Sequence, residues 1–231
     1  MVEFRVFRYD PDKDGEPKFQ SYKFEEPEGM TVLEGLYHIL ENMDNSLAFR
    51  SSCREAVCGS CAMHINGQYR LACKTQIAPL GKVITVRPLA HLPVIKDLVA
   101  DMTPFWENFK KIQPYLIPRE QPPEKEYYQS VEDRKKIDDL LDCILCGACY
   151  GSCPVASQDE KYLGPHALLK VLRFVNDSRD GAAKDRVMFV ASDYGVFRCH
   201  TIFNCREVCP KELDPTKAIA KLKMKAIFKN F

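Results

Sequence analysis

The stretch from Cys143 to Pro154 decides the fold, and it reads Cys-Ile-Leu-Cys-Gly-Ala-Cys-Tyr-Gly-Ser-Cys-Pro. Its cysteines recur after two, two and three intervening residues, and a proline follows the last one. This is the bacterial iron–sulfur pattern, in which the fourth cysteine binds the other cluster of a pair. The run therefore predicts two clusters whose ligands are shared with a second cysteine group.

The second cysteine group, which ends in Cys209 and Pro210, repeats this pattern with one member missing. Ile202 stands at the position of the middle ligand, and isoleucine cannot coordinate metal. Because the fourth cysteines cross over, Cys209 completes a four-thiolate site, while Cys153 joins a three-thiolate site whose fourth iron is expected to be lost. The predicted ligands are Cys143, Cys146, Cys149 and Cys209 for a 4Fe–4S cluster and Cys153, Cys199 and Cys205 for a 3Fe–4S cluster. A complete 4Fe–4S cluster, with water or another side chain at the open corner, remains the alternative.

A third group lies in the first third of the chain and has the plant-type 2Fe–2S spacing, C-x4-C-x2-C with a fourth cysteine further on. The predicted ligands are Cys53, Cys58, Cys61 and Cys73. Backbone N–H groups of Ser51, Ser52 and Gly59 are expected to donate hydrogen bonds to the sulfurs. A zinc site usually pairs two short knuckles, and Cys73 has no nearby cysteine or histidine to form the second one.

The three predicted sites use all eleven cysteines, whereas a coincidence of spacing would be expected to leave some over. Disulfides are typical of small secreted scaffolds, but this count is odd. The start, Met1 to Phe4, leads into a strand pattern rather than a signal or transit peptide. Zinc remains the alternative metal, and a zinc-binding interaction module is the corresponding function.

The bulk composition excludes some partners and activities. Lys and Arg number 33 against 32 Asp and Glu, so no excess of positive charge favours nucleic acid. No run is long and apolar enough for a transmembrane helix, so we expect no membrane segment in this chain. No serine–histidine–aspartate set, glycine-rich phosphate loop or flavin fingerprint is present. The chain alone is therefore expected to carry electrons rather than to be a complete enzyme.

Hydrophobic periodicity predicts a mixed α+β domain in the first third. Val2 to Val6 alternate as in a half-buried strand, and Tyr22 to Phe24 suggest its hairpin partner. Thr31 to Glu34 form a capping box that opens an amphipathic helix. The pair Asn66-Gly67 predicts a type I′ turn between two further strands, and Val83 to Val86 predict a final strand.

After Pro88 the pattern becomes helical. The predicted helices are 101–115, 131–141, one opened by Gly164-Pro165 and one that runs from Asp214-Pro215 to the C-terminus. We therefore predict two domains, a 2Fe–2S ferredoxin-like domain at 1–100 and an α-helical ferredoxin domain with the other two clusters at 101–231. The proline-rich stretch 118–123 is a rival boundary.

Three stretches together resemble the iron–sulfur subunit of succinate dehydrogenase and fumarate reductase: Phe49 to Cys61, Cys143 to Pro154, and Phe197 to Pro210. The resemblance covers nearly the whole chain, and the combined motifs are highly specific. It implies a β-grasp plant-type ferredoxin domain followed by a mostly α-helical bacterial-ferredoxin-like domain. It also implies an FAD flavoprotein partner that oxidises succinate, and a membrane anchor, with or without haem, that binds quinone.

In such a complex electrons would pass from flavin through the 2Fe–2S, 4Fe–4S and 3Fe–4S clusters to quinone, as in respiratory complex II of the tricarboxylic acid cycle. The subunit would lie peripherally on the cytoplasmic face of a prokaryotic inner membrane. The chain resembles both branches of the family, so fumarate reduction in the reverse direction remains an alternative. A free ferredoxin-like carrier without a fixed complex is another.

The resemblance also points to a quinone pocket beside the 3Fe–4S cluster, where Pro154, His200 and Ile202 match family positions. His200 could relay a proton or hydrogen-bond a quinone oxygen, and a surface histidine without function is the alternative. The tryptophan that many ubiquinone-reducing relatives carry shortly after the Cys-Pro pair is absent, and the only tryptophan is Trp106. Ubiquinone and menaquinone therefore both remain open.

Overall fold

The computed structural model describes residues 1–121 and 123–229, and the chain divides into two units. The N-terminal unit comprises Met1–Met102 together with Ile144–Ser152. The C-terminal unit comprises Thr103–Cys143 and the chain from Cys153 onward. The segment Ile144–Ser152 therefore packs with the N-terminal unit although it belongs to the middle cysteine run. The predicted final helix extends to residues 230–231, which lie outside the described residues.

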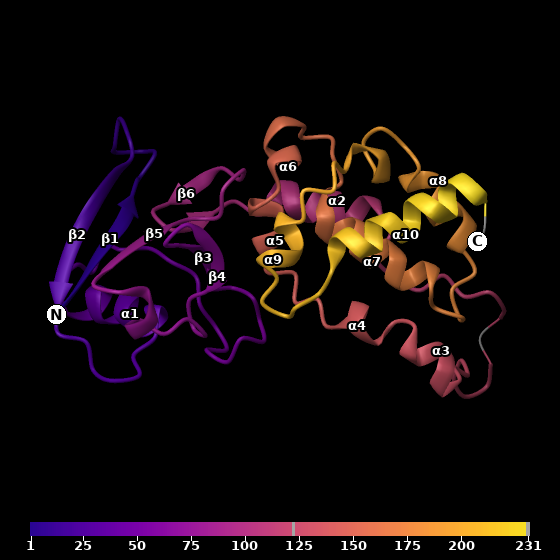
Figure 1. Ribbon diagram of the computed structural model, residues 1–231, viewed down its shortest axis with the longest axis horizontal. Helices are drawn as coiled ribbons and strands as arrows, with labels where there is room; N and C mark the ends of the chain where they lie inside the picture. The colour runs from indigo at the N-terminus through magenta and orange to yellow at the C-terminus, as the bar shows by residue number, and fades with distance from the viewer. Residues whose placement is uncertain (122, 230–231) are drawn as a thin grey trace. The chain divides into compact units, whose positions relative to one another are not determined.

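A five-stranded mixed sheet forms the core of the N-terminal unit, with the strand order β2-β1-β5-β3-β4 (Figure 1). Its strands are β1 (Val2–Arg8), β2 (Lys18–Phe24), β3 (Ala62–Ile65), β4 (Gln68–Leu71) and β5 (Val83–Arg87). β1 pairs parallel with β5, and the other pairings in this sheet are antiparallel. Val2, Phe4 and Val6 are buried, which confirms the strand that their alternation predicts. The unit also contains η1 (Ala78–Leu80) and a short ladder of β6 (Val94–Lys96) and β7 (Val99–Ala100).

Helix α1 (Val32–Asn42) begins at the predicted capping box. Thr31 Oγ1 accepts a hydrogen bond from the N–H of Glu34 at 3.3 Å, and the Glu34 carboxylate accepts one from the N–H of Thr31 at 2.7 Å. A cap of this kind stabilises a helix by about 1 kcal/mol. The Asn66-Gly67 turn is confirmed as type I′, because its two residues have positive φ angles of 45° and 84°.

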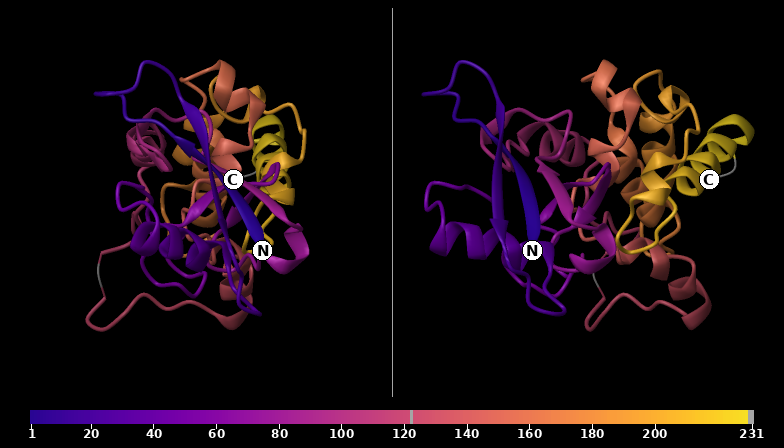
Figure 2. Two further views of the ribbon diagram at one scale, coloured as in Figure 1. Left: turned by 90° about the vertical axis from the view of Figure 1, so that its left-hand side faces the viewer. Right: turned by 60° about the vertical axis from the view of Figure 1, so that its left-hand side comes forward.

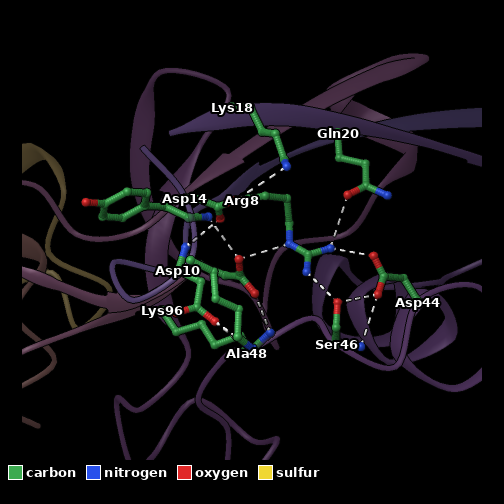
Figure 3. A network of polar contacts seen from close by, with 12 residues as sticks. Arg8, Asp10, Asp14, Lys18, Gln20, Asp44, Ser46, Ala48 and Lys96 are labelled. Carbon is green, nitrogen blue, oxygen red and sulfur yellow. Dashed lines mark hydrogen bonds and ion pairs between the residues drawn. The ribbon is translucent and has the colours of Figure 1, made fainter. Parts of the chain in front are cut away.

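A buried arginine ties the sheet to the loop after α1 (Figure 3). Arg8 is only 7% exposed, and its guanidinium donates to Asp97 at 2.9 Å and to Tyr22 Oη at 2.6 Å. It also bonds to Asp44 and, at 2.7 Å, to Ser46 Oγ. Burial opposes ionisation of Asp44, but hydrogen bonds, that of Ser46 the largest, hold the pKa of this carboxyl below its usual range. The network therefore stabilises the ionised form of the carboxylate.

We expect Arg8→Met to lower the free energy of unfolding by about 3 kcal/mol, because it leaves a buried carboxylate without its cation. Because folding lowers the pKa of Asp44, its ionised carboxylate contributes fully to stability above its unfolded-state pKa of about 3.9. That stabilisation is lost as the pH falls through the folded-state pKa. Thermal unfolding should therefore be compared at neutral pH. The control is Arg5→Met on the same strand, since the Arg5 side chain is 53% exposed in its pair with Glu3. Equal shifts in the two variants would contradict the expectation.

The C-terminal unit is helical apart from its connecting loops, and α7 and α10 lie side by side in it (Figures 1 and 2). Its elements are α2 (Thr103–Lys111), α3 (Val131–Lys135), α4 (Asp138–Leu141), α6 (Pro154–Gln158), α7 (Gly164–Val175), α8 (Ala183–Val190), η2 (Val196–Arg198), α9 (Asn204–Glu207) and α10 (Pro215–Phe228). The predicted starts of α7 and α10 are confirmed, and Asp214 caps α10 by accepting from the N–H of Lys217 at 2.8 Å. Within the described residues, no helix has the length and apolarity needed to cross a bilayer.

Two predicted helices are wrong in extent. The helix predicted at 101–115 covers only Thr103–Lys111, because Gln113 adopts a left-handed backbone with φ of 49°. The helix predicted at 131–141 is two short helices. The N–H groups of Lys136 and Ile137 bond carbonyls three residues back, at 3.1 and 3.0 Å, which tightens the turn and sends Ile137 into the core.

Candidate metal centres

The first cysteine group lies in the N-terminal unit, on the loop before β3 and just after β4. The loop turns backbone N–H groups toward the sulfurs. Cys53 Sγ accepts three such bonds at 3.2–3.4 Å, from Glu55, Val57 and Cys58. Cys73 Sγ accepts one from Ala56 at 3.3 Å. The loop therefore surrounds its thiols with donors, as an anionic cluster requires.

The prediction of which residues donate these bonds is wrong. In the described chain, Ser51, Ser52 and Gly59 do not make them. The reason is the backbone of Arg54 and Ala56, whose φ angles of 60° and 57° turn the following N–H groups inward. Non-glycine residues in this region are strained by about 1–3 kcal/mol each and persist only where their surroundings hold them.

Helix α1 holds the start of this loop. Tyr37 Oη and Ser51 Oγ are 2.6 Å apart, and the guanidinium of Arg54 lies 4.6 Å from the centre of the Tyr37 ring. The hydroxyl of Ser51 is thus engaged with the helix rather than with a thiol. Tyr37 and Arg54 were not among the predicted site residues, because their contact depends on the fold of the loop.

The thiols of this group differ in acidity. A hydrogen bond from Ser60, followed by one from the N–H of Cys53, lowers the pKa of Cys58 to about 6. Burial raises the pKa of Cys61 to about 12. Because the thiolate is the form that binds metal, these shifts favour the metal-binding form of Cys58 near neutral pH and oppose that of Cys61.

The middle cysteine run is divided between the two units. Cys146 and Cys149 lie in the segment Ile144–Ser152 of the N-terminal unit, where the second is part of α5 (Ala148–Gly151). Cys143 belongs to the C-terminal unit, as does Cys209, which follows α9. The predicted 4Fe–4S ligands therefore come from both units.

The remaining three cysteines come together within the C-terminal unit. Cys153, Cys199 and Cys205 line one concavity that is partly open to solvent. Burial raises the pKa of Cys153, while N–H groups in the first turn of α6 bond to its thiol and oppose the shift. Burial raises the pKa of Cys205 to about 11, although Thr216 Oγ1 lies 3.3 Å from its sulfur. Ile202 lines the same concavity.

The residues predicted to bind quinone gather at this concavity. Pro154, His200 and Ile202 all line it beside the three thiols, and His200 is exposed. Lys223 was not predicted here, yet its Nζ donates to the carbonyl of Cys199 at 2.8 Å. It lies on the same face of α10 as Thr216, seven residues earlier, so helical spacing could have indicated the pair.

The donor sets fit iron–sulfur clusters. The first and third sites combine several thiols with backbone N–H donors, and such bonds stabilise the negative charge that a cluster places on its sulfurs. Among the described residues, no group of three or more His, Cys, Asp or Glu side chains is arranged to hold a single metal ion.

Two family models match the chain. Residues 3–107 match a 2Fe-2S iron-sulfur cluster binding domain, and residues 139–213 match a 4Fe-4S dicluster domain. Together with the mixed sheet and the helical second unit, these matches confirm the predicted fold class.

Comparisons over the whole chain agree with these matches. The chain is 43% identical over 222 residues to the succinate dehydrogenase iron-sulfur subunit of Paracoccus denitrificans, covering 95% of this chain and 86% of the relative. It is similar to a chain of the Mycobacterium smegmatis Sdh1 complex in the apo form, with a TM-score of 0.88 and 27% identity over 99% of this chain and 96% of the other. A hypothetical protein from Helicobacter pylori shares the fold alone, at a TM-score of 0.58 and 18% identity, over 100% of this chain and 40% of that one.

Proposed function

Because the chain belongs to the family of succinate dehydrogenase iron–sulfur subunits, we propose that it passes electrons from an FAD flavoprotein that oxidises succinate to a membrane quinone. The single observation that carries this proposal is the 43% identity over 95% of the chain to a succinate dehydrogenase subunit. Succinate oxidation is favoured over fumarate reduction or a free carrier, because the relative with 43% identity is a succinate dehydrogenase iron-sulfur subunit and the similar solved chain belongs to an Sdh1 complex.

The ligand sets are part of the proposal. Each cluster, when bound, accepts and releases one electron. The proposed ligands are Cys53, Cys58, Cys61 and Cys73 for 2Fe–2S, Cys143, Cys146, Cys149 and Cys209 for 4Fe–4S, and Cys153, Cys199 and Cys205 for 3Fe–4S. Ile202 beside the last three thiols supports a cluster with a bare corner. A domain boundary near residue 100 also belongs to the proposal.

The concavity of the C-terminal unit supports a quinone site next to a membrane anchor. Its thiols lie beside apolar side chains that are unusually exposed, Ile202 at 48% and Phe203 at 44%. Exposed apolar patches of this kind mark partner surfaces. We place quinone against Pro154, His200 and Ile202, and the chain on the cytoplasmic face of a prokaryotic inner membrane, held there by the anchor.

Purification of the native complex tests this function. We expect an FAD-containing subunit and an anchor to co-purify, and succinate to reduce quinone. A monomer without flavoprotein, or a complex inactive with succinate, would contradict the proposal.

His200→Ala separates the quinone site from the rest of the function. Loss of one hydrogen bond to quinone is expected to lower quinone reduction about tenfold, at roughly 1.4 kcal/mol for the bond. Succinate oxidation with a soluble dye as acceptor should stay unchanged, and this assay is the control. If quinone reduction is also unchanged, His200 is a surface histidine.

A further inference from the structure

Gly59 is buried between two exposed neighbours, Cys58 and Ser60. Its φ angle of 73° lies in the left-handed region, and a Cβ at this position would lie 2.8 Å from Cys146 Cβ and 2.9 Å from Cys146 Cα. The carbonyl oxygen of Ile144 would lie 3.1 Å away. These atoms are backbone or Cβ, so they cannot move aside without displacing Cys146 itself. The absence of a side chain at Gly59 therefore allows the approach.

The two segments in contact carry ligands of different proposed clusters. Gly59 is on the loop that holds Cys58 and Cys61, and its carbonyl accepts a hydrogen bond from the N–H of Ala62 at 3.2 Å, which fixes it in the turn. Cys146 is a proposed ligand of the 4Fe–4S cluster. Both segments belong to the N-terminal unit.

We propose that Gly59 is a positioning residue that brings the two ligand segments into contact, and that electrons pass between the first and second clusters at this contact. The inference rests on the proposed function. One electron leaves the side of Cys58 and Cys61 and arrives at the side of Cys146, while no bond forms or breaks and no proton moves. Succinate, through the partner flavin, is the reductant. Electron transfer through space weakens steeply with distance, so a side chain that parts the segments should slow it.

Gly59→Ala in the full complex tests the proposal, with Gly67→Ala as the matched control. Gly67 has a φ angle of 84°, and a Cβ at that position would have nothing within 4 Å, so its variant carries the same backbone strain without the crowding. The readout is the magnetic interaction between the reduced 2Fe–2S and 4Fe–4S clusters in EPR, seen as faster relaxation of each signal. We expect Gly59→Ala to keep its iron but to show a weaker interaction, with slower relaxation of each signal, and Gly67→Ala to retain the interaction of the wild type.

Full iron together with an unchanged interaction in Gly59→Ala would overturn the proposal. If Gly59→Ala fails to assemble, the wild-type complex is measured instead. Contact between the two ligand segments predicts that the reduced 2Fe–2S and 4Fe–4S clusters speed each other's relaxation. Clusters that relax independently would contradict the proposal. These outcomes are distinct from failure of the proposed function, in which no flavoprotein would co-purify with the wild-type chain or succinate would not reduce quinone.

Discussion

Replacing Ile202 with cysteine should raise the iron content from about nine to about ten atoms per chain and abolish the EPR signal of an oxidised 3Fe–4S cluster. The substitution restores the full C-x2-C-x2-C-x3-C-P spacing in the second cysteine group. The side chain at 202 lines the concavity that Cys153, Cys199 and Cys205 share. A fourth thiolate there would hold the iron that is missing from the proposed three-thiolate cluster.

Phe203→Cys is the matched control for this experiment. Phe203 lines the same concavity and is 44% exposed, but a cysteine there is one position out of the ligand spacing. This variant should keep the iron content and the signal of the unchanged protein. Unaltered iron in Ile202→Cys, or four irons at this site before any substitution, would contradict the assignment of a three-thiolate cluster.

A buried ion pair organises the C-terminal unit. The Arg186 guanidinium donates to both carboxylate oxygens of Asp180, at 3.1 and 2.9 Å, and neither side chain is more than 3% exposed. It also donates to the carbonyl groups of Ile112, Gln113 and Tyr115 at 2.7–3.0 Å. Arg186 thus binds both the carbonyl groups that follow the C-terminus of α2 and the carboxylate in the turn before α8.

Arg186→Ala is therefore expected to lower the free energy of unfolding by about 3–5 kcal/mol, because it leaves the buried Asp180 carboxylate unpaired. Guanidinium unfolding followed by far-UV circular dichroism measures the effect. The control is Arg134→Ala, whose pair with Asp138 is as short, at 2.6 Å, but is 55% and 48% exposed. An exposed pair is worth about 0–1 kcal/mol. Equal midpoints for the two variants would contradict the role of the buried pair.

The local structure follows closely from residue patterns. The strand Val2–Arg8, the capping box at Thr31 and the helix starts at Gly164 and Pro215 each depend on a few neighbouring residues, and all are present. The end of α2 at Lys111 does not depend on neighbouring residues alone. Arg186, which is distant in sequence, binds the carbonyl groups that follow this end.

The sequence proposes the ligands of the clusters, but it does not predict the surroundings of their thiols. Cysteine spacing alone proposes the three ligand sets. The donors around Cys53 depend on left-handed φ angles at Arg54 and Ala56, and neither residue type favours that conformation. The packing of Ile144–Ser152 with the N-terminal unit depends on close contacts such as that of Gly59 with Cys146, which no periodic pattern reports.

We propose that all eleven cysteines bind iron–sulfur clusters. Metal and acid-labile sulfide analysis of the anaerobically purified complex, with EPR of the same sample, measures this most directly. We predict about nine irons and about ten sulfides per chain, with a paramagnetic signal from an oxidised 3Fe–4S cluster. Stoichiometric zinc without sulfide, or cysteines joined as disulfides, would rule out iron–sulfur clusters at these sites.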